Sequence, residues 1–254
     1  MNQLILSLFP GADLFGRAFE ERGFCIVRGP DRLWAQDVRD FHAIPGKFDG
    51  IIGGPPCQPF SAAAISGSDA ENLIPEFVRI IEESRPQWAV MENVMGAAGA
   101  APPWPSTTIR DWDVGGNTFR KRTFWFYGID PAPKPILRAG EPNYSVLASS
   151  WNRHGQLVGR GPNKPLSAEK AAALQGFPNL GEQLIEGLPG KLQGDGVKWR
   201  GVSLSSRNIL AVHMLGNGVP RAMGLYIARH VENQLEGRSS IELTGLPLFS
   251  SMGV

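Results

Sequence analysis

The sequence has few of the residues on which several classes of protein depend. Two cysteines, Cys25 and Cys57, stand far apart among 254 residues, and neither lies in a spacing that suits a zinc site or a disulfide framework. Charge is nearly balanced, with 25 basic and 24 acidic side chains, so the whole molecule is not a strongly basic nucleic-acid binder. We therefore expect a reduced, intracellular protein in which any basic surface is local.

Long apolar runs are also missing. No stretch reaches the ~18 residues that a membrane-spanning helix needs. The short apolar run within residues 1–11 has no basic segment before it, so it does not have the pattern of a signal peptide. The sequence therefore predicts a soluble, cytoplasmic protein with no membrane partner. Its 42% of hydrophobic residues can still bury a full core, as one domain or as one domain with a small addition.

The sequence does contain a repeated alternation of strand and helix patterns. Apolar runs predict strands at residues 4–9, 24–27, 49–52, 88–91 and 123–129. Helical spacing predicts a helix that begins near Asp13 and others around residues 77–81, 167–174 and 220–231. Strands that alternate with helices are typical of a doubly wound α/β sheet.

The sharpest local signal is the segment Gly-Gly-Pro-Pro-Cys-Gln-Pro-Phe-Ser at residues 53–61, directly after a predicted strand. Ligand sites in open α/β sheets lie beyond the carboxyl ends of strands, and two glycines with three prolines fix an unusual loop there. A cysteine in such a loop is a candidate nucleophile if its surroundings lower the thiol pKa or protonate its electrophile. The structural alternative for Cys57 is a buried, inert cysteine in a stiff turn.

Six segments of the chain, in this order, resemble the motifs of the DNA cytosine-5 methyltransferase family, and a compact phage or prophage member in particular. They are residues 6–11 (LSLFPG), the cysteine loop at 53–61, Glu92-Asn93-Val94, 118–122 (TFRKR), 166–179 (LSAEKAAALQGFPN) and 215–220 (LGNGVP). The resemblance covers most of residues 4–232. It implies the α/β, Rossmann-like fold of S-adenosylmethionine-dependent methyltransferases, a doubly wound mixed sheet with a small, irregular target-recognition region.

The resemblance also implies how the chain is organised. We expect a cofactor-binding and catalytic domain at residues 1–130 and a short target-recognition region at 131–207, which includes the helix at 167–174. Residues 208–235 are expected to form a C-terminal helix that returns to the catalytic domain, and 236–254 a peripheral tail. We expect a monomer.

For the chemistry, the resemblance implies transfer of a methyl group from S-adenosyl-L-methionine to carbon 5 of a flipped-out cytosine in double-stranded DNA. Cys57 would attack carbon 6, because carbon 5 is a poor nucleophile until something adds there. Glu92 would engage ring nitrogen N3, and burial would raise its pKa so that it can donate a proton. One or both of Arg120 and Arg122 would hold the O2 atom of the base and the catalytic loop.

For the cofactor, the resemblance points to the turn after the first strand, to acidic residues after the second strand and to the last motif. The implied contacts are Ser7, Leu8, Phe9, Gly11, Ala12, Asp31, Asp37 and Asn217. Phe9 would pack on the adenine, Asp31 would bind the ribose hydroxyls and Asp37 would accept from the adenine amine. Asp31 and Asp37 have an alternative interpretation as solvated charges or helix caps. The turn at Asn217 would close the pocket, which requires the last motif to pack back on the first.

The sequence departs from the family pattern at two motifs. The first motif usually starts with an acidic residue followed by Leu-Phe, whereas this chain has Ser7-Leu8-Phe9. The motif usually continues with a glycine-rich stretch, whereas this chain has Ala12-Asp13-Leu14. In the arginine motif, Thr118 stands where the family usually has a glutamine, two residues before the first arginine. These changes leave open a non-catalytic DNA-binding paralogue, and an RNA-methylating branch with a similar cysteine loop leaves RNA open as the substrate. A cysteine hydrolase is disfavoured, because none of the four histidines stands in a recognisable pairing.

Recognition of DNA falls, by the same resemblance, to residues 131–165. This segment has no regular period and carries five basic residues against one acidic, with Tyr144 and Trp151 interleaved. Its arginines at 138, 153 and 160 (Arg138, Arg153 and Arg160) are expected to contact guanine edges or phosphates. Gln58 and Ser61 are expected to line the gap left by the flipped base. The segment is short, which suggests a brief target sequence. A second basic stretch at 191–207 is better interpreted as a solvated loop.

Overall fold

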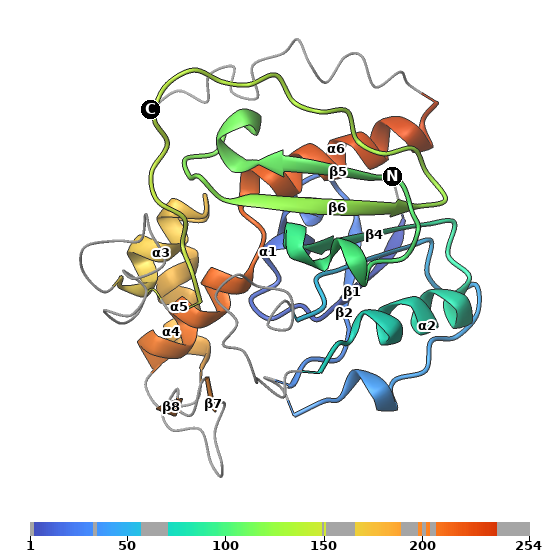
Figure 1. Cartoon of the computed structure of the whole chain (residues 1–254). Helices are drawn as coiled ribbons and strands as arrows, with labels where there is room; N and C mark the ends of the chain where they lie inside the picture. The colour runs from blue at the N-terminus through green and yellow to red at the C-terminus, as the bar shows by residue number, and fades with distance from the viewer. Residues whose placement is uncertain are drawn as a thin grey trace.

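A six-stranded mixed sheet forms the centre of the molecule, with strand order β2-β1-β3-β4-β6-β5 (Figure 1). The computed structural model describes residues 3–32, 35–56, 71–148, 150, 166–188, 198–199, 202–203 and 207–237. The strands are β1 (Leu4–Leu8), β2 (Cys25–Arg28), β3 (Gly50–Gly53), β4 (Trp88–Asn93), β5 (Ser106–Arg110) and β6 (Lys121–Tyr127). The first four pair in parallel, and β6 runs antiparallel to β4 and β5. A separate small pair joins β7 (Lys198–Trp199) and β8 (Val202–Ser203).

Helices cover both faces of this sheet, so the doubly wound architecture predicted from the sequence is confirmed. On one face lie α1 (Leu14–Glu20) and α6 (Arg221–Leu235), and on the other lies α2 (Ile74–Ser84). The other helices are α3 (Ala168–Leu174), α4 (Leu180–Gly187) and α5 (Arg207–Asn217). Successive side chains of a strand point to opposite faces. Ile5 accordingly packs in the cluster with α1 and α6, whereas its neighbour Leu6 packs in the cluster with α2. Both faces are therefore apolar, which explains the continuous hydrophobic runs in the sequence.

A third core cluster joins α3, α4 and α5 beside the sheet (Figure 1). Gln175, at the end of α3, links this cluster to the rest of the fold. Its side-chain Nε2 donates to the carbonyl of Leu215 at 2.6 Å, and its own carbonyl accepts from the backbone N–H of Arg221 at 2.8 Å. The segment 208–235 was expected to be one returning helix. It consists of most of α5, which belongs to the third cluster, and α6, which packs on the sheet.

The end of the described chain packs closely against α1. A Cβ atom at Gly218 would lie 2.6 Å from Leu14 Cδ1, and one at Gly224 would lie 2.6 Å from Ala18 Cβ. Both positions therefore require glycine for the close approach of the two segments. The last motif thus lies against α1, the helix that follows the first motif. Within the described residues, no helix has the length and apolar character to cross a membrane.

Candidate active site

Strand direction brings two of the predicted catalytic residues, Glu92 and Arg122, to one edge of the sheet. The carboxyl ends of parallel strands β1, β3 and β4 share this edge. Because β6 runs the other way, its first residues join them, and the register places Glu92 opposite Phe124 and Asn93 opposite Thr123. Arg122, two residues before Phe124, thereby comes beside the end of β4.

Glu92 is a buried carboxylate that faces a cation. Its Oε1 lies 2.7 Å from Nε of Arg122. Burial raises the pKa of Glu92, and the charges of Arg122 and Arg120 oppose that rise. A Cβ atom at Gly54 would lie 2.8 Å from Glu92 Oε2. The glycine therefore leaves open the space beside the carboxyl group, where a larger residue would intrude.

Asn93 ties the end of β4 to the start of the cysteine loop. Its Nδ2 donates to the carbonyl of Pro55 at 3.1 Å, and its Oδ1 accepts from the backbone N–H of Val94 at 2.8 Å. This clamp lies two residues ahead of Cys57. Sequence reasoning assigned Asn93 no role, although it stands in the Glu-Asn-Val motif. The predicted residues Cys57, Gln58, Ser61, Arg153 and Arg160 lie outside the described residues.

Arg120 has a different environment from Arg122. It is buried, and its Nη1 donates to the carbonyl of Val146 at 2.7 Å, which ties β6 to the segment that follows. Two residues earlier, Thr118 donates its backbone N–H and its hydroxyl to Asp111 Oδ2, at 2.9 and 2.7 Å. Asp111 opens a 3₁₀ helix, η4 (Asp111–Val114), and burial raises its pKa against the influence of Thr118 and Arg120. The departure at position 118 therefore anchors the arginine motif to a buried carboxylate that sequence reasoning missed.

Arg138 is the one predicted DNA-binding arginine among the described residues. Its guanidinium carbon lies 3.9 Å from the centre of the Trp112 ring, a cation–π contact. Its backbone N–H donates to Asp113 Oδ1 at 3.0 Å, and Trp112 Nε1 donates to its carbonyl at 3.2 Å. The side chain is exposed, so this local packing fixes it at the surface.

A cavity of about 440 Å³ opens at the same sheet edge, between the turn after β1, the end of β2 and α4. Among the predicted cofactor residues, Gly11 and Ala12 line it, and Ser7 and Leu8 lie buried at the end of β1. The described lining residues are Pro10, Gly11, Ala12, Asp13, Arg17, Arg28, Gly29, Gln36, Gln183, Leu184, Gly187 and Leu188.

The remaining predicted cofactor residues are not among the described residues that line this cavity. Asp31 Oδ2 accepts from the N–H of Gly11 at 2.8 Å, so this carboxylate fixes the turn itself. Phe9 has a φ of 54° and packs on the cluster with α2. Neither Asp37 nor Asn217 is among the described lining residues.

Asp37 and Asn217 both have local partners. Asp37 caps a 3₁₀ helix, η2 (Val38–Asp40), by accepting from the N–H of Arg39 at 3.0 Å, and it pairs with the side chains of Arg39 and Arg32. Those hydrogen bonds and charges lower the pKa of Asp37. The structure thus makes Asp37 a helix cap, the alternative interpretation of its sequence. Asn217 ends α5, with Nδ2 3.1 Å from Nε2 of His213.

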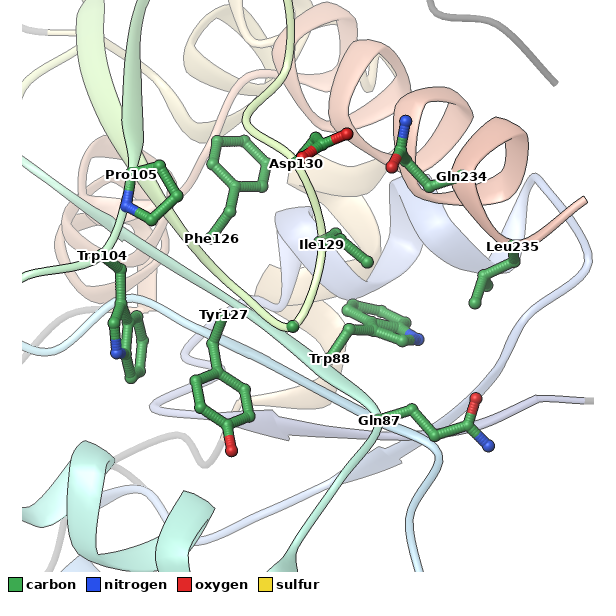
Figure 2. Close-up of a pocket in the computed structure, with 11 residues that line it drawn as sticks. Gln87, Trp88, Trp104, Pro105, Phe126, Tyr127, Ile129, Asp130, Gln234 and Leu235 are labelled. Carbon is green, nitrogen blue, oxygen red and sulfur yellow. The ribbon is translucent and has the colours of Figure 1, made fainter. Parts of the chain in front are cut away.

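A larger cavity, of about 700 Å³, lies at the opposite edge of the sheet (Figure 2). Trp88 at the start of β4 and Tyr127 at the end of β6 line it, together with Trp104 and Asp130. Glu92 and Arg122 lie toward the other ends of the same two strands. The larger cavity is therefore separate from the candidate active site.

Comparison with known proteins identifies the segment that holds the cysteine loop and Glu92. Residues 32–101 match the family profile described as C-5 cytosine-specific DNA methylase. Residues 32–101 therefore resemble part of a C-5 cytosine-specific DNA methylase domain. The matched part of this methylase domain includes β3, α2 and β4, the elements that present Gly54, Glu92 and Asn93.

Relatives of the methylase domain carry consistent names. The Type II methyltransferase M1.HphI of Haemophilus parahaemolyticus is 49% identical over 122 residues, which cover 37% of this chain and 33% of that protein. The Type II methyltransferase M.NgoPII of Neisseria gonorrhoeae is 34% identical over 113 residues, which cover 36% of this chain and 33% of that protein. The chain thus spans about a third of the length of the curated relatives it matches.

Solved structures share the fold of this chain over nearly its whole length. A protein described as a DNA modification methyltransferase encoded within an E. coli prophage matches with a TM-score of 0.57 at 15% identity. The Entamoeba histolytica methyltransferase EhMeth matches with a TM-score of 0.54 at 12% identity. Each alignment covers 92% of this chain and 99% of the other. The predicted methyltransferase fold is confirmed.

Proposed function

We propose that this protein is a DNA (cytosine-5-)-methyltransferase that acts on a flipped-out cytosine in double-stranded DNA. The observation that carries the proposal is the buried pair of Glu92 and Arg122 at the sheet edge where Asn93 holds the start of the cysteine loop. A carboxyl group with a raised pKa suits proton donation to a base, and Arg122 fixes its orientation. The methylase domain and the names of its relatives support the same reaction.

The cavity at this edge fits S-adenosyl-L-methionine as the cofactor. Its lining combines two guanidinium groups, Arg17 and Arg28, with the side-chain amide of Gln183 and the apolar side chains of Leu184 and Leu188. A ligand with an ammonium group, a carboxylate and a flat ring system offers complementary groups to such a lining. When bound, S-adenosyl-L-methionine supplies an electrophilic methyl group.

The chain's own residues then have distinct tasks around this cofactor. Gly11 and Ala12 would line its site, and Asp31 would hold the turn that carries them. Phe9 and Asn217 would make further contacts with the cofactor.

The proposed reaction begins with a bond between Cys57 Sγ and carbon 6 of the cytosine. The electron pair of the 5,6 double bond moves into the ring, and Glu92 donates a proton to N3, so that carbon 5 becomes nucleophilic. After carbon 5 has gained the methyl group, it loses its own proton to solvent. The bond between sulfur and carbon 6 then breaks, and Glu92 recovers the N3 proton.

Bisulfite sequencing of DNA from cells that express the chain tests this function directly. We expect cytosines in one short sequence context to resist conversion, and DNA from cells that express a Cys57→Ser variant to convert fully. Titration of the purified chain with S-adenosyl-L-methionine should show saturable binding. Complete conversion in the presence of the folded, cofactor-binding protein would exclude cytosine-5 methylation of DNA.

Single alanine substitutions at Arg138, Arg153 and Arg160 should separate base contacts from phosphate contacts. A bidentate base contact is worth roughly 1–3 kcal/mol of discrimination, whereas loss of a phosphate contact weakens binding to all sequences and reduces the salt dependence. Binding to a panel of duplexes at two salt concentrations measures both effects. Lys47→Ala is the matched control, because Lys47 is exposed and precedes β3 at the opposite sheet edge. Unchanged preference and salt slope in all three variants would place recognition elsewhere, for example at residues 191–207.

A further inference from the structure

The turn that follows β1 has an unusual backbone. Phe9, Gly11 and Asp13 have φ values of 54°, 54° and 51°, in the left-handed region that only glycine adopts readily. Two of the three are not glycine, so tertiary contacts have to hold the turn in this shape. The same turn lines the cavity proposed for the cofactor.

Asp13 makes the contacts that hold this turn. It is only 3% exposed, and its Oδ1 accepts from the hydroxyl of Ser7 at 2.7 Å and from the N–H of Gly16 at 3.1 Å. Its Oδ2 lies 2.9 Å from Nε of Arg28, at the end of β2. A Cβ atom at Gly16 would lie 2.3 Å from Oδ2, so the glycine makes room for the carboxylate. One side chain thus joins β1, β2 and the first turn of α1.

The two departures of the first motif meet at this contact. Where the family pattern has an acidic residue, this chain has Ser7, and where the pattern has glycine, it has Asp13. The side chains of these two residues are hydrogen-bonded to each other. Asp13, at the other end of the turn, therefore places a carboxylate next to position 7, where the family pattern has its acidic residue.

We propose that Asp13 is a positioning residue for the cofactor, whose carboxylate replaces the one missing at position 7 and holds Gly11 and Ala12 in place along the cavity. This role rests on the proposed function, because it assumes that the cavity binds S-adenosyl-L-methionine. A residue that merely filled the turn would be replaced without loss by glycine, which favours a positive φ.

The energetics of Asp13 support a role beyond folding. Burial raises its pKa to about 6, from an ordinary value of 3.8, although Ser7 and Arg28 oppose the rise. The stabilisation that the Asp13 side chain gives to the folded state is therefore fully present below about pH 3.8, where the carboxyl group is protonated. It is lost as the pH rises through about 6. Near neutral pH the buried charge opposes folding, and the like charge of Glu20 adds to this effect. A neutral amide at this position should not lower the melting temperature at pH 8.

Binding of S-adenosyl-L-homocysteine to the full chain, measured by calorimetry, tests the proposal with four variants. Asp13→Gly and Asp13→Asn should each weaken binding about tenfold or more, because hydrogen bonds to a charged group are lost. Ser7→Asp combined with Asp13→Gly should recover most of the affinity, since the carboxylate returns from position 7. Ser7→Asp alone should bind weakly, because two carboxylates then share one site.

Thermal unfolding at pH 8 separates positioning from general stability. We expect Asp13→Asn and Asp13→Gly to melt within a few degrees of the wild type while they bind weakly. Wild-type affinity in both variants, or loss of affinity only in proportion to loss of stability, would overturn the role of Asp13. Failure of the double variant to recover affinity while it remains folded would also overturn it. Absence of binding by the wild type would instead overturn the proposed function on which this role rests.

Discussion

Replacement of Cys57 by serine is expected to reduce methyl transfer by at least ~10⁴-fold, because a hydroxyl is a far weaker nucleophile than a thiolate at neutral pH. Binding of S-adenosyl-L-homocysteine should change by less than about twofold, since the two side chains are similar in volume. Transfer of a labelled methyl group to a duplex with the target sequence measures the first effect, and calorimetry measures the second.

Cys25→Ser is the matched control for this experiment. Cys25 lies on β2 and is exposed, so its replacement should leave both activity and binding unchanged. A duplex with 5-fluorocytosine at the target provides an independent check, because fluorine at carbon 5 cannot leave as a proton does. A denaturation-resistant adduct should form with the wild type and Cys25→Ser, and only when cofactor is present. Near-normal turnover by Cys57→Ser would remove Cys57 from the mechanism.

Replacement of Glu92 by glutamine is expected to lower the rate of methyl transfer by ~10²–10⁴-fold, the range of a general acid. The amide keeps the size of the side chain but cannot donate the carboxyl proton, and it leaves Arg122 without its charged partner. The single-turnover rate, measured with saturating cofactor and DNA, isolates this step from binding.

The pH dependence of the same rate distinguishes an acid from a structural carboxylate. Burial raises the pKa of Glu92, so the protonated form persists to higher pH than in an ordinary glutamate. The wild-type rate should fall as the pH rises through that raised pKa, because the proton donor is lost, and Glu92→Gln should lack this limb. Glu82→Gln, an exposed position on α2, is the control and should keep the wild-type profile. A rate within about threefold of wild type for Glu92→Gln would exclude Glu92 as the acid.

Local patterns were enough to predict most of the elements that position the site. The strands around Ile5, Ile52 and Val90 are buried on both faces, so each appears as a continuous apolar run. The helix that begins after Asp13 was also predicted, since Asp13 is its N-cap. The cysteine loop and the Glu-Asn-Val motif stood out because their residue types suit one chemistry at one sheet edge.

Local patterns did not predict β5, α4 or α5, each for a physical reason, although the family resemblance had placed most of α5 within one returning helix. β5 is a short edge strand with several polar side chains, and its pairing with β6 joins it to the sheet. α5 is buried on nearly all sides, so it lacks the apolar stripe that marks an amphipathic helix. α4 is short and contains Gly181 and Gly187, which weaken a helical pattern.

Buried strands, helix periodicity and motif spacing are local properties of the chain, so they were sufficient to predict the fold class and to reveal the ordered motifs. Which side chains meet, such as Glu92 with Arg122 and Ser7 with Asp13, depends on the tertiary structure. Each pair joins segments whose separation in space depends on strand register and on the path of a turn. A pattern of residue types along the chain does not specify either quantity.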